Sequence, residues 1–87
     1  MAKHLCEIHG IHAGVPLVYE SQIVESDKLA IEIEREVNQA IAENTHSEKG
    51  PETMVQCSTI DLIGHATFKA FKDRAVDLER DLTIMDK

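Results

Sequence analysis

The pattern of apolar and polar residues is most regular in the last third of the chain. A series of apolar residues recurs there at alternating steps of three and four, which is the spacing of one helical face. We call this series the helix seam, and its members are Phe68, Phe71, Ala75, Leu78, Leu82 and Met85. Ser58 and Asp61, three places apart, have the spacing of a capping box. The pattern predicts one long helix over about residues 58–86, with Glu79 on its polar surface.

The length of this helix bears on the oligomeric state. About 28 helical residues span ~42 Å, whereas a compact chain of 87 residues has a diameter of ~31 Å. The helix would extend beyond the globule unless it bends at Gly64. Burying a Leu or Phe side chain stabilises a fold by ~1.5–3 kcal/mol, so the helix seam should be covered, first by the rest of the chain and in part by a second copy. We therefore expect a homodimer that pairs through the C-terminal helix.

The N-terminal residues have the pattern of a β-hairpin over about residues 3–23. Residues 3–9 alternate between two faces with a period of two, and residues 15–23 form a second stretch with strand composition. The segment 10–14 between them carries two glycines, which suit a turn.

Two further elements are expected before the C-terminal helix. Ser26 is suited to cap a helix over about residues 26–44, whose apolar residues gather on one stripe. The polar segment 45–52 follows, and we expect it to be a flexible loop. Residues 53–57 are short and tolerant of β-structure, and they are expected to form a third strand.

The order of these elements predicts an α+β fold in a single domain, residues 1–87. The order ββαβα gives a three-stranded, mainly antiparallel sheet with two helices on one face. One alternative stays open, because residues 54–63 fit the strand and helix patterns poorly. In that alternative the third strand continues to Ile63 and the C-terminal helix begins only after Gly64.

The charge balance argues against several classes of partner. Sixteen acidic residues outnumber nine basic ones, and the net charge is −7, so the chain lacks the basic surface that binds nucleic acid or an anionic membrane. Aromatic residues make up only 3% of the chain, too few for a stacking platform for single-stranded nucleic acid. The two helices instead offer acidic side chains to a basic protein partner, at Glu32, Glu36, Asp77 and Asp81.

The N-terminal residues and the number of cysteines both bear on the expected cellular location. No N-terminal apolar run has the length of a signal peptide or of a membrane span. Two cysteines do not make a disulfide framework. We expect a cytoplasmic protein with reduced thiols.

One group of residues is a candidate for metal or thiol chemistry, and it comprises His4, Cys6, His9, His12, Cys57 and His65. Cys6 and His9 have a spacing that can bind one tetrahedral zinc ion, so a zinc-stabilised binding module using Cys6, His9, Cys57 and a further His is one alternative. A thiol-dependent enzyme with Cys57 at a dimer interface is a second. Because cysteines of this kind are more often buried as plain hydrophobes, we predict no metal, no cofactor and no catalytic residue.

These features predict a small, acidic, non-enzymatic protein that acts by binding another macromolecule, as a regulator, an adaptor or an assembly factor. An 87-residue chain has little room for a catalytic cleft. Its four glycines do not have the spacing of a phosphate-binding loop.

Overall fold

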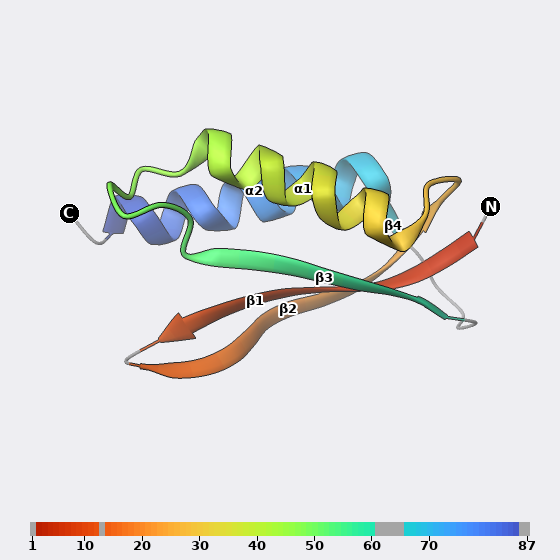
Figure 1. Ribbon diagram of the computed structural model, residues 1–87, viewed down its shortest axis with the longest axis horizontal. Helices are drawn as coiled ribbons and strands as arrows, with labels where there is room; N and C mark the ends of the chain where they lie inside the picture. The colour runs from red at the N-terminus through yellow and green to blue at the C-terminus, as the bar shows by residue number, and fades with distance from the viewer. Residues whose placement is uncertain (1, 13, 61–65, 86–87) are drawn as a thin grey trace.

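The computed structural model describes residues 2–12, 14–60 and 66–85, with only the backbone described for His12 and Met85. The elements in chain order are β1 (Ala2–His12), β2 (Val15–Ser26), α1 (Ala30–Asn44), β3 (Thr53–Ile60), β4 (Ala66–Thr67) and α2 (Phe68–Met85). Both helices lie on one face of the sheet, and none of these six elements covers the other face (Figure 1).

The sheet has four strands in the order β3-β1-β2-β4. The first strand, β1, is central and pairs antiparallel with β2 and with β3, whereas β4 pairs parallel with β2. The α+β class, the two helices and the long C-terminal helix are confirmed, but the prediction of three strands is incomplete. The additional strand has only two residues, Ala66 and Thr67, and two residues are too few to show any periodicity.

The boundary between β3 and α2 differs from the main prediction. Ser58 lies within β3 and pairs with Leu5, so it does not cap a helix. The helix begins at Phe68, has 18 residues and therefore spans ~27 Å. The predicted overhang of a ~42 Å helix is therefore wrong, because pairing with β1 keeps this segment extended as far as Ile60. Asp61, Gly64 and the remainder of residues 61–65 lie outside the described residues.

The first helix also begins later than predicted. Ser26 is the last residue of β2, where it pairs with Ala2, and its hydroxyl accepts the backbone N–H of Lys28 at 3.1 Å. Pairing in the sheet thus takes the residue that the sequence suggested as a helix cap. The helix instead begins after Leu29, whose N–H donates to the Glu32 carboxylate at 3.2 Å. This contact is one half of a capping box.

The hairpin is confirmed, and both of its strands are longer than predicted. Gly14 has a φ of 79°, a conformation that suits glycine at the turn. Gly10 lies against the ring of Tyr19, and a Cβ at this position would come 2.1 Å from the ring. Any side chain at position 10 would therefore displace Tyr19. The register of the hairpin also shifts between Ile8 and His9, as in a β-bulge.

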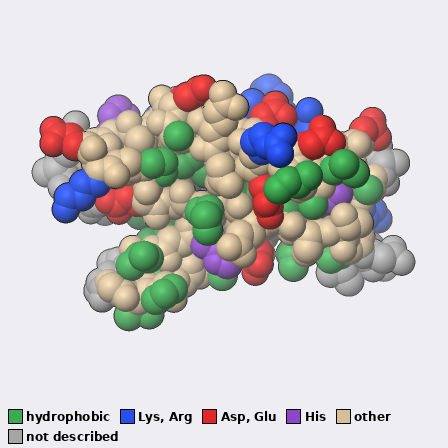
Figure 2. Space-filling model, viewed as in Figure 1, with side chains coloured by type: hydrophobic (Ala, Val, Ile, Leu, Met, Phe, Trp, Pro, Cys, Tyr) green, Lys and Arg blue, Asp and Glu red, His purple; other side chains and the backbone are tan. Residues whose placement is uncertain are grey.

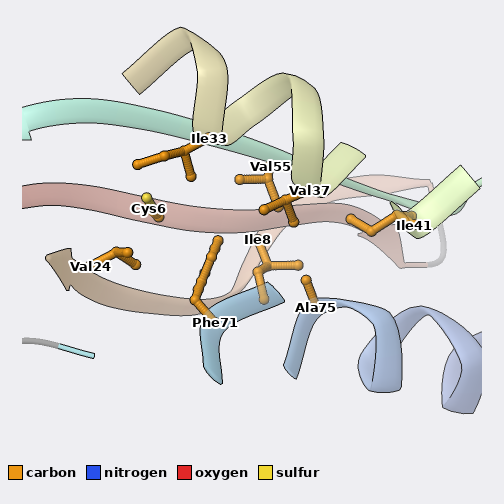
Figure 3. Packing of buried hydrophobic residues seen from close by; sticks show 9 residues of the cluster. All are labelled: Cys6, Ile8, Val24, Ile33, Val37, Ile41, Val55, Phe71 and Ala75. Atoms are coloured by element: carbon orange, nitrogen blue, oxygen red, sulfur yellow. The ribbon is translucent and has the colours of Figure 1, made fainter. Parts of the chain in front are cut away.

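The core fills the space between the sheet and the helices (Figure 3). Its buried cluster consists of Cys6, Ile8, Val24, Ile33, Val37, Ile41, Val55, Phe71 and Ala75. Phe71 and Ala75 come from the helix seam, and Phe68 and Leu78 pack against the same cluster. Leu82 is half-buried, and the side chain of Met85 lies outside the described part. The chain itself thus covers the centre of the helix seam. Neither described helix combines the length and apolar character needed to cross a membrane.

Candidate functional site: the groove between the helices

The candidate zinc ligands are separated by the sheet. Cys6 is fully buried and points toward the helices, whereas His9, an odd number of residues along β1, lies on the opposite face. One metal ion cannot reach both side chains. Within residues 2–12, 14–60 and 66–85, no group of three or more His, Cys, Asp or Glu side chains could hold a metal ion. His65 and the side chain of His12 lie outside these described parts.

The two cysteines are neighbours, because Cys6 and Cys57 occupy directly opposite positions on β1 and β3. Hydrogen bonding with the Cys6 thiol and burial raise the pKa of Cys57 above its ordinary value, and the negative charge of Glu34 acts in the same direction. A raised pKa lowers the thiolate population at neutral pH, which is the opposite of what a thiol nucleophile requires.

Among the candidate residues for metal or thiol chemistry, His4 is buried as well as Cys6. Its imidazole is only 1% exposed, and Nδ1 lies 3.3 Å from the hydroxyl of Thr59 on β3. Nε2 has no hydrogen-bond partner among the described residues. His9, on the open face, has its Nε2 3.5 Å from the Glu7 carboxylate but makes no hydrogen bond there, so that pair attracts only when the ring is protonated.

Polar side chains of the helices close the outer edge of β3. The side-chain amide of Asn38 pairs with both backbone groups of Val55, accepting its N–H at 2.7 Å and donating to its carbonyl at 3.1 Å. Glu34 accepts the N–H of Cys57 at 2.7 Å, and Glu79 accepts the N–H of Thr53 at 2.9 Å. Three alternate amides of an edge strand are thus occupied, which blocks the addition of another strand.

Glu79 is the most deeply buried acid of the described residues, although the sequence placed it on the polar surface of the helix. Its side chain is 0% exposed. Its carboxylate accepts hydrogen bonds from the hydroxyls of Thr45 and Thr53 and from the backbone N–H groups of Glu52 and Thr53, each at 2.9 Å at the nearest oxygen. The helix seam passes from Ala75 to Leu78 and therefore leaves Glu79 out. The buried row instead continues from Phe71 and Ala75 at steps of four, and the next residue in that row is Glu79.

A groove of about 700 Å³ runs between the outward faces of α1 and α2. It is lined by Glu36, Gln39, Ala40, Glu43, Asn44, Lys72, Asp73, Val76, Asp77 and Arg80. Four of these residues carry carboxylates and two carry positive charges. Ala40 and Val76 add an apolar strip between them. In Figure 2 the charged side chains gather mainly over the helix layer.

Three of the four carboxylates that line the groove lie in ion pairs, and Asp73 is one of them, 3.5 Å from the ammonium of Lys69. Glu36 lies 3.1 Å from the ammonium of Lys28 and 3.7 Å from that of Lys72, so it is shared between two cations. Asp77 lies 3.9 Å from the guanidinium of Arg80. Exposed pairs of this kind contribute less than ~1 kcal/mol each and exchange readily with other partners.

The predicted acidic surface is therefore only partly gathered at one site. Glu36 and Asp77 line the groove, whereas Glu32 and Asp81 do not. Sequence reasoning missed Glu43 and Asp73, which complete the groove from opposite helices. Each stands one or two helical turns from a predicted acid, but only the packing of α1 against α2 shows which acids share the groove.

Comparison of the chain with known protein families, curated proteins and solved structures found no match. The groove, the residues that line it and the faces of the sheet are therefore the features that indicate a function.

Proposed function

We propose that this protein is a non-enzymatic binding protein, acting as a regulator, adaptor or assembly factor, that takes a basic segment of another protein in the groove between α1 and α2. The observation that carries the proposal is the lining of the groove, four carboxylates against two cations around an apolar strip. The net charge of −7 attracts a basic partner from a distance and repels phosphate backbones and anionic membranes.

The groove is suited to long basic side chains. A lysine or arginine of the partner can lay its aliphatic stem along Ala40 and Val76 while its charged head meets Glu43 or Asp77. Guanidinium groups bind carboxylates in a bidentate manner, so an arginine-rich segment fits better than a lysine-rich one. Because the carboxylates are exposed, added salt should weaken binding strongly.

An octa-arginine peptide is a direct probe of the groove. We expect the double variant Glu43→Gln/Asp77→Asn to bind the peptide roughly tenfold more weakly than the parent protein in calorimetry at low salt. The matched control, Asp27→Asn/Glu48→Gln, removes the same two charges from exposed positions outside the groove and should weaken binding less than about twofold. Equal losses in both variants would mean that the peptide senses net charge and not the groove.

We also propose a homodimer, but one that pairs through the open face of the sheet and not through the C-terminal helix. Phe71 and Ala75 are buried inside one chain and are not available to a second copy. The open face of the sheet carries three exposed apolar side chains, which we call the hairpin patch: Ile11, Val18 and Met54, exposed by 63%, 44% and 49%. His9 lies between two of them, paired with Val18 on one side and Met54 on the other.

Electrostatics favours this patch for self-association. Two copies of charge −7 repel each other over most of their surfaces. None of the three residues of the hairpin patch is charged, and hydrophobic side chains gather at the end of the hairpin in Figure 2. Sheets that pack face to face bury such apolar residues between them. The patch would thus join two copies and leave both acidic grooves open to partners.

A further inference from the structure

Cys6 and Cys57 are placed as a cross-strand pair in the centre of the sheet. Cys6 lies on the central strand and is 0% exposed, and Cys57 lies opposite it on the edge strand and is partly buried. Side chains at directly opposite positions project from the same face of a sheet. Both sulfur atoms therefore lie on the helix side, where Figure 3 shows Cys6 among the core residues.

The hydrogen bonds of β3 show which kind of pair this is. Directly opposite residues of antiparallel strands alternate between hydrogen-bonded pairs, with Cα atoms ~5.5 Å apart, and non-hydrogen-bonded pairs ~4.5 Å apart. The N–H of Cys57 points away from β1, because it donates to Glu34 at 2.7 Å. The N–H of Val55, two residues earlier, likewise donates to Asn38. Cys6 and Cys57 therefore form a non-hydrogen-bonded, closely spaced pair.

We infer that Cys6 and Cys57 are an intramolecular disulfide site, closed when the protein meets a hydroperoxide. The Cα separation of a closely spaced pair falls within the ~4.4–6.8 Å range that disulfides occupy. No movement of the backbone is needed to bring the residues together. The site is independent of the proposed groove, and its closure would fix the edge strand β3 to β1 by a covalent bond.

The two thiols differ in access, which assigns their roles. Cys57 lines a surface hollow of about 360 Å³ together with Glu34 and Asn38, whereas Cys6 is sealed in the core. With hydrogen peroxide as the oxidant, the Cys57 sulfur attacks a peroxide oxygen, loses its proton, and becomes a sulfenic acid as one water leaves. The Cys6 sulfur then attacks the Cys57 sulfur, its proton leaves with the hydroxyl as a second water, and the S–S bond forms. Two thiols are oxidised by two electrons while one peroxide is reduced to two waters.

The environment makes this site slow to close and stable once closed. Hydrogen bonding with Cys6 and burial raise the pKa of Cys57, so few thiolates are present to attack the peroxide at neutral pH. The bond would enclose the chain from β1 to β3, including β2 and α1. Closing a loop of this length restricts the unfolded chain, and the midpoint of thermal unfolding should rise by roughly 10 °C or more.

Oxidation of the full-length protein tests the inference. After treatment with hydrogen peroxide, or with diamide, which accepts two hydrogens from a thiol pair and spares methionine, we expect single chains under denaturing, non-reducing conditions, with a peptide map that links Cys6 to Cys57. Dithiothreitol should reverse both the link and the rise in the thermal midpoint. Cys57→Ser should show neither change with either oxidant.

Three outcomes would overturn the inference. The first is oxygen addition to Cys57 without a link to Cys6, and the second is a disulfide found only between copies. The third is a protein whose two thiols remain free after diamide treatment. Cys6→Ala, which keeps an apolar residue in the core, checks the roles: its Cys57 should accumulate sulfinic acid under peroxide because no resolving thiol is present.

Discussion

Glu79 organises the loop between α1 and β3 in the way that a capping residue organises the end of a helix. Its carboxylate accepts two hydroxyl and two backbone donors, all from residues 45–53. Thr83, one turn later, accepts the N–H of His46 at 3.0 Å and donates to the carbonyl of Glu79 at 2.7 Å. A buried carboxylate is tolerated when hydrogen bonds replace its hydration. Two residues of α2 thus hold the loop onto the helix.

Replacing Glu79 with Gln should destabilise the protein by about 2 kcal/mol. The variant keeps one acceptor oxygen but turns an amide NH₂ toward donors that need an acceptor, and a buried donor left unpaired costs ~1–3 kcal/mol. Urea denaturation gives the free energy of unfolding. The matched control is Asp77→Asn on the same helix, which is exposed and should change stability by less than ~0.5 kcal/mol. Equal stability of the two variants would show that the loop does not depend on Glu79.

At the scale of elements, the two edges of the sheet differ. On one edge, β3 has alternate amides occupied by side chains of α1 and α2. On the other edge, β4 pairs with only Val24 and Glu25 of β2. Along the rest of β2, Pro16 and the irregularity opposite Ile8 and His9 are features that natural edge strands use against unwanted pairing.

Asn38→Ala should open the β3 edge. The substitution removes the side-chain partners of both backbone groups of Val55, and we expect a loss of ~1–3 kcal/mol in the free energy of unfolding together with association beyond the proposed homodimer. Urea denaturation and light scattering measure the two effects. Gln39→Ala is the control, because Gln39 is exposed on the same helix and its side chain donates to the Glu43 carboxylate at 3.2 Å, away from β3. If both variants associated, the cause would be a change in α1 and not the exposure of the β3 edge.

The elements also show how far the sequence could be interpreted. Alternation predicted the hairpin, because each strand has one face in the core, as with Cys6 and Ile8. The main prediction began α2 too early, at residue 58, because residues 58–60 stay extended by pairing with β1, a contact between segments about 50 residues apart. The alternative, in which the helix begins only after Gly64, is nearer to the observed start at Phe68. The burial of Glu79 depends on donors from a distant loop, and the groove depends on which faces of two helices meet. Such features arise from tertiary contacts, which local patterns do not contain.

At the scale of the whole molecule, the two sides of the structure carry different surfaces. The helix layer carries the acidic groove, and the open side of the sheet carries the hairpin patch. Both sides belong to the proposal and both can be tested separately, because the core lies between them. A partner bound in the groove would not touch the hairpin patch.

Val18→Asp should convert the proposed homodimer to a monomer in sedimentation velocity, because it places a charge in the hairpin patch. Leu82→Asp should lower the free energy of unfolding by ~1–3 kcal/mol but keep the dimer, since Leu82 belongs to the half-buried rim of the helix seam. Ala42→Asp is the control, as it adds the same charge to an exposed residue of α1 on the other side of the molecule. If only Leu82→Asp lost the dimer, the interface would lie on the C-terminal helix and not on the hairpin patch. A parent protein that is monomeric would refute the homodimer.

The central place of β1 has a consequence for the order of events during synthesis. The central strand β1 is made before both of the strands that flank it, β2 and β3. Its hairpin with β2 can form early, but its other side finds its partner only after Ile60 has been made. At ~5–20 residues per second, about 50 further residues take roughly 3–10 s. During that interval, the side of β1 that later pairs with β3 is an open edge. Asn38 and Glu34 do not protect it, because they cover the outer edge of β3, which has not yet been made.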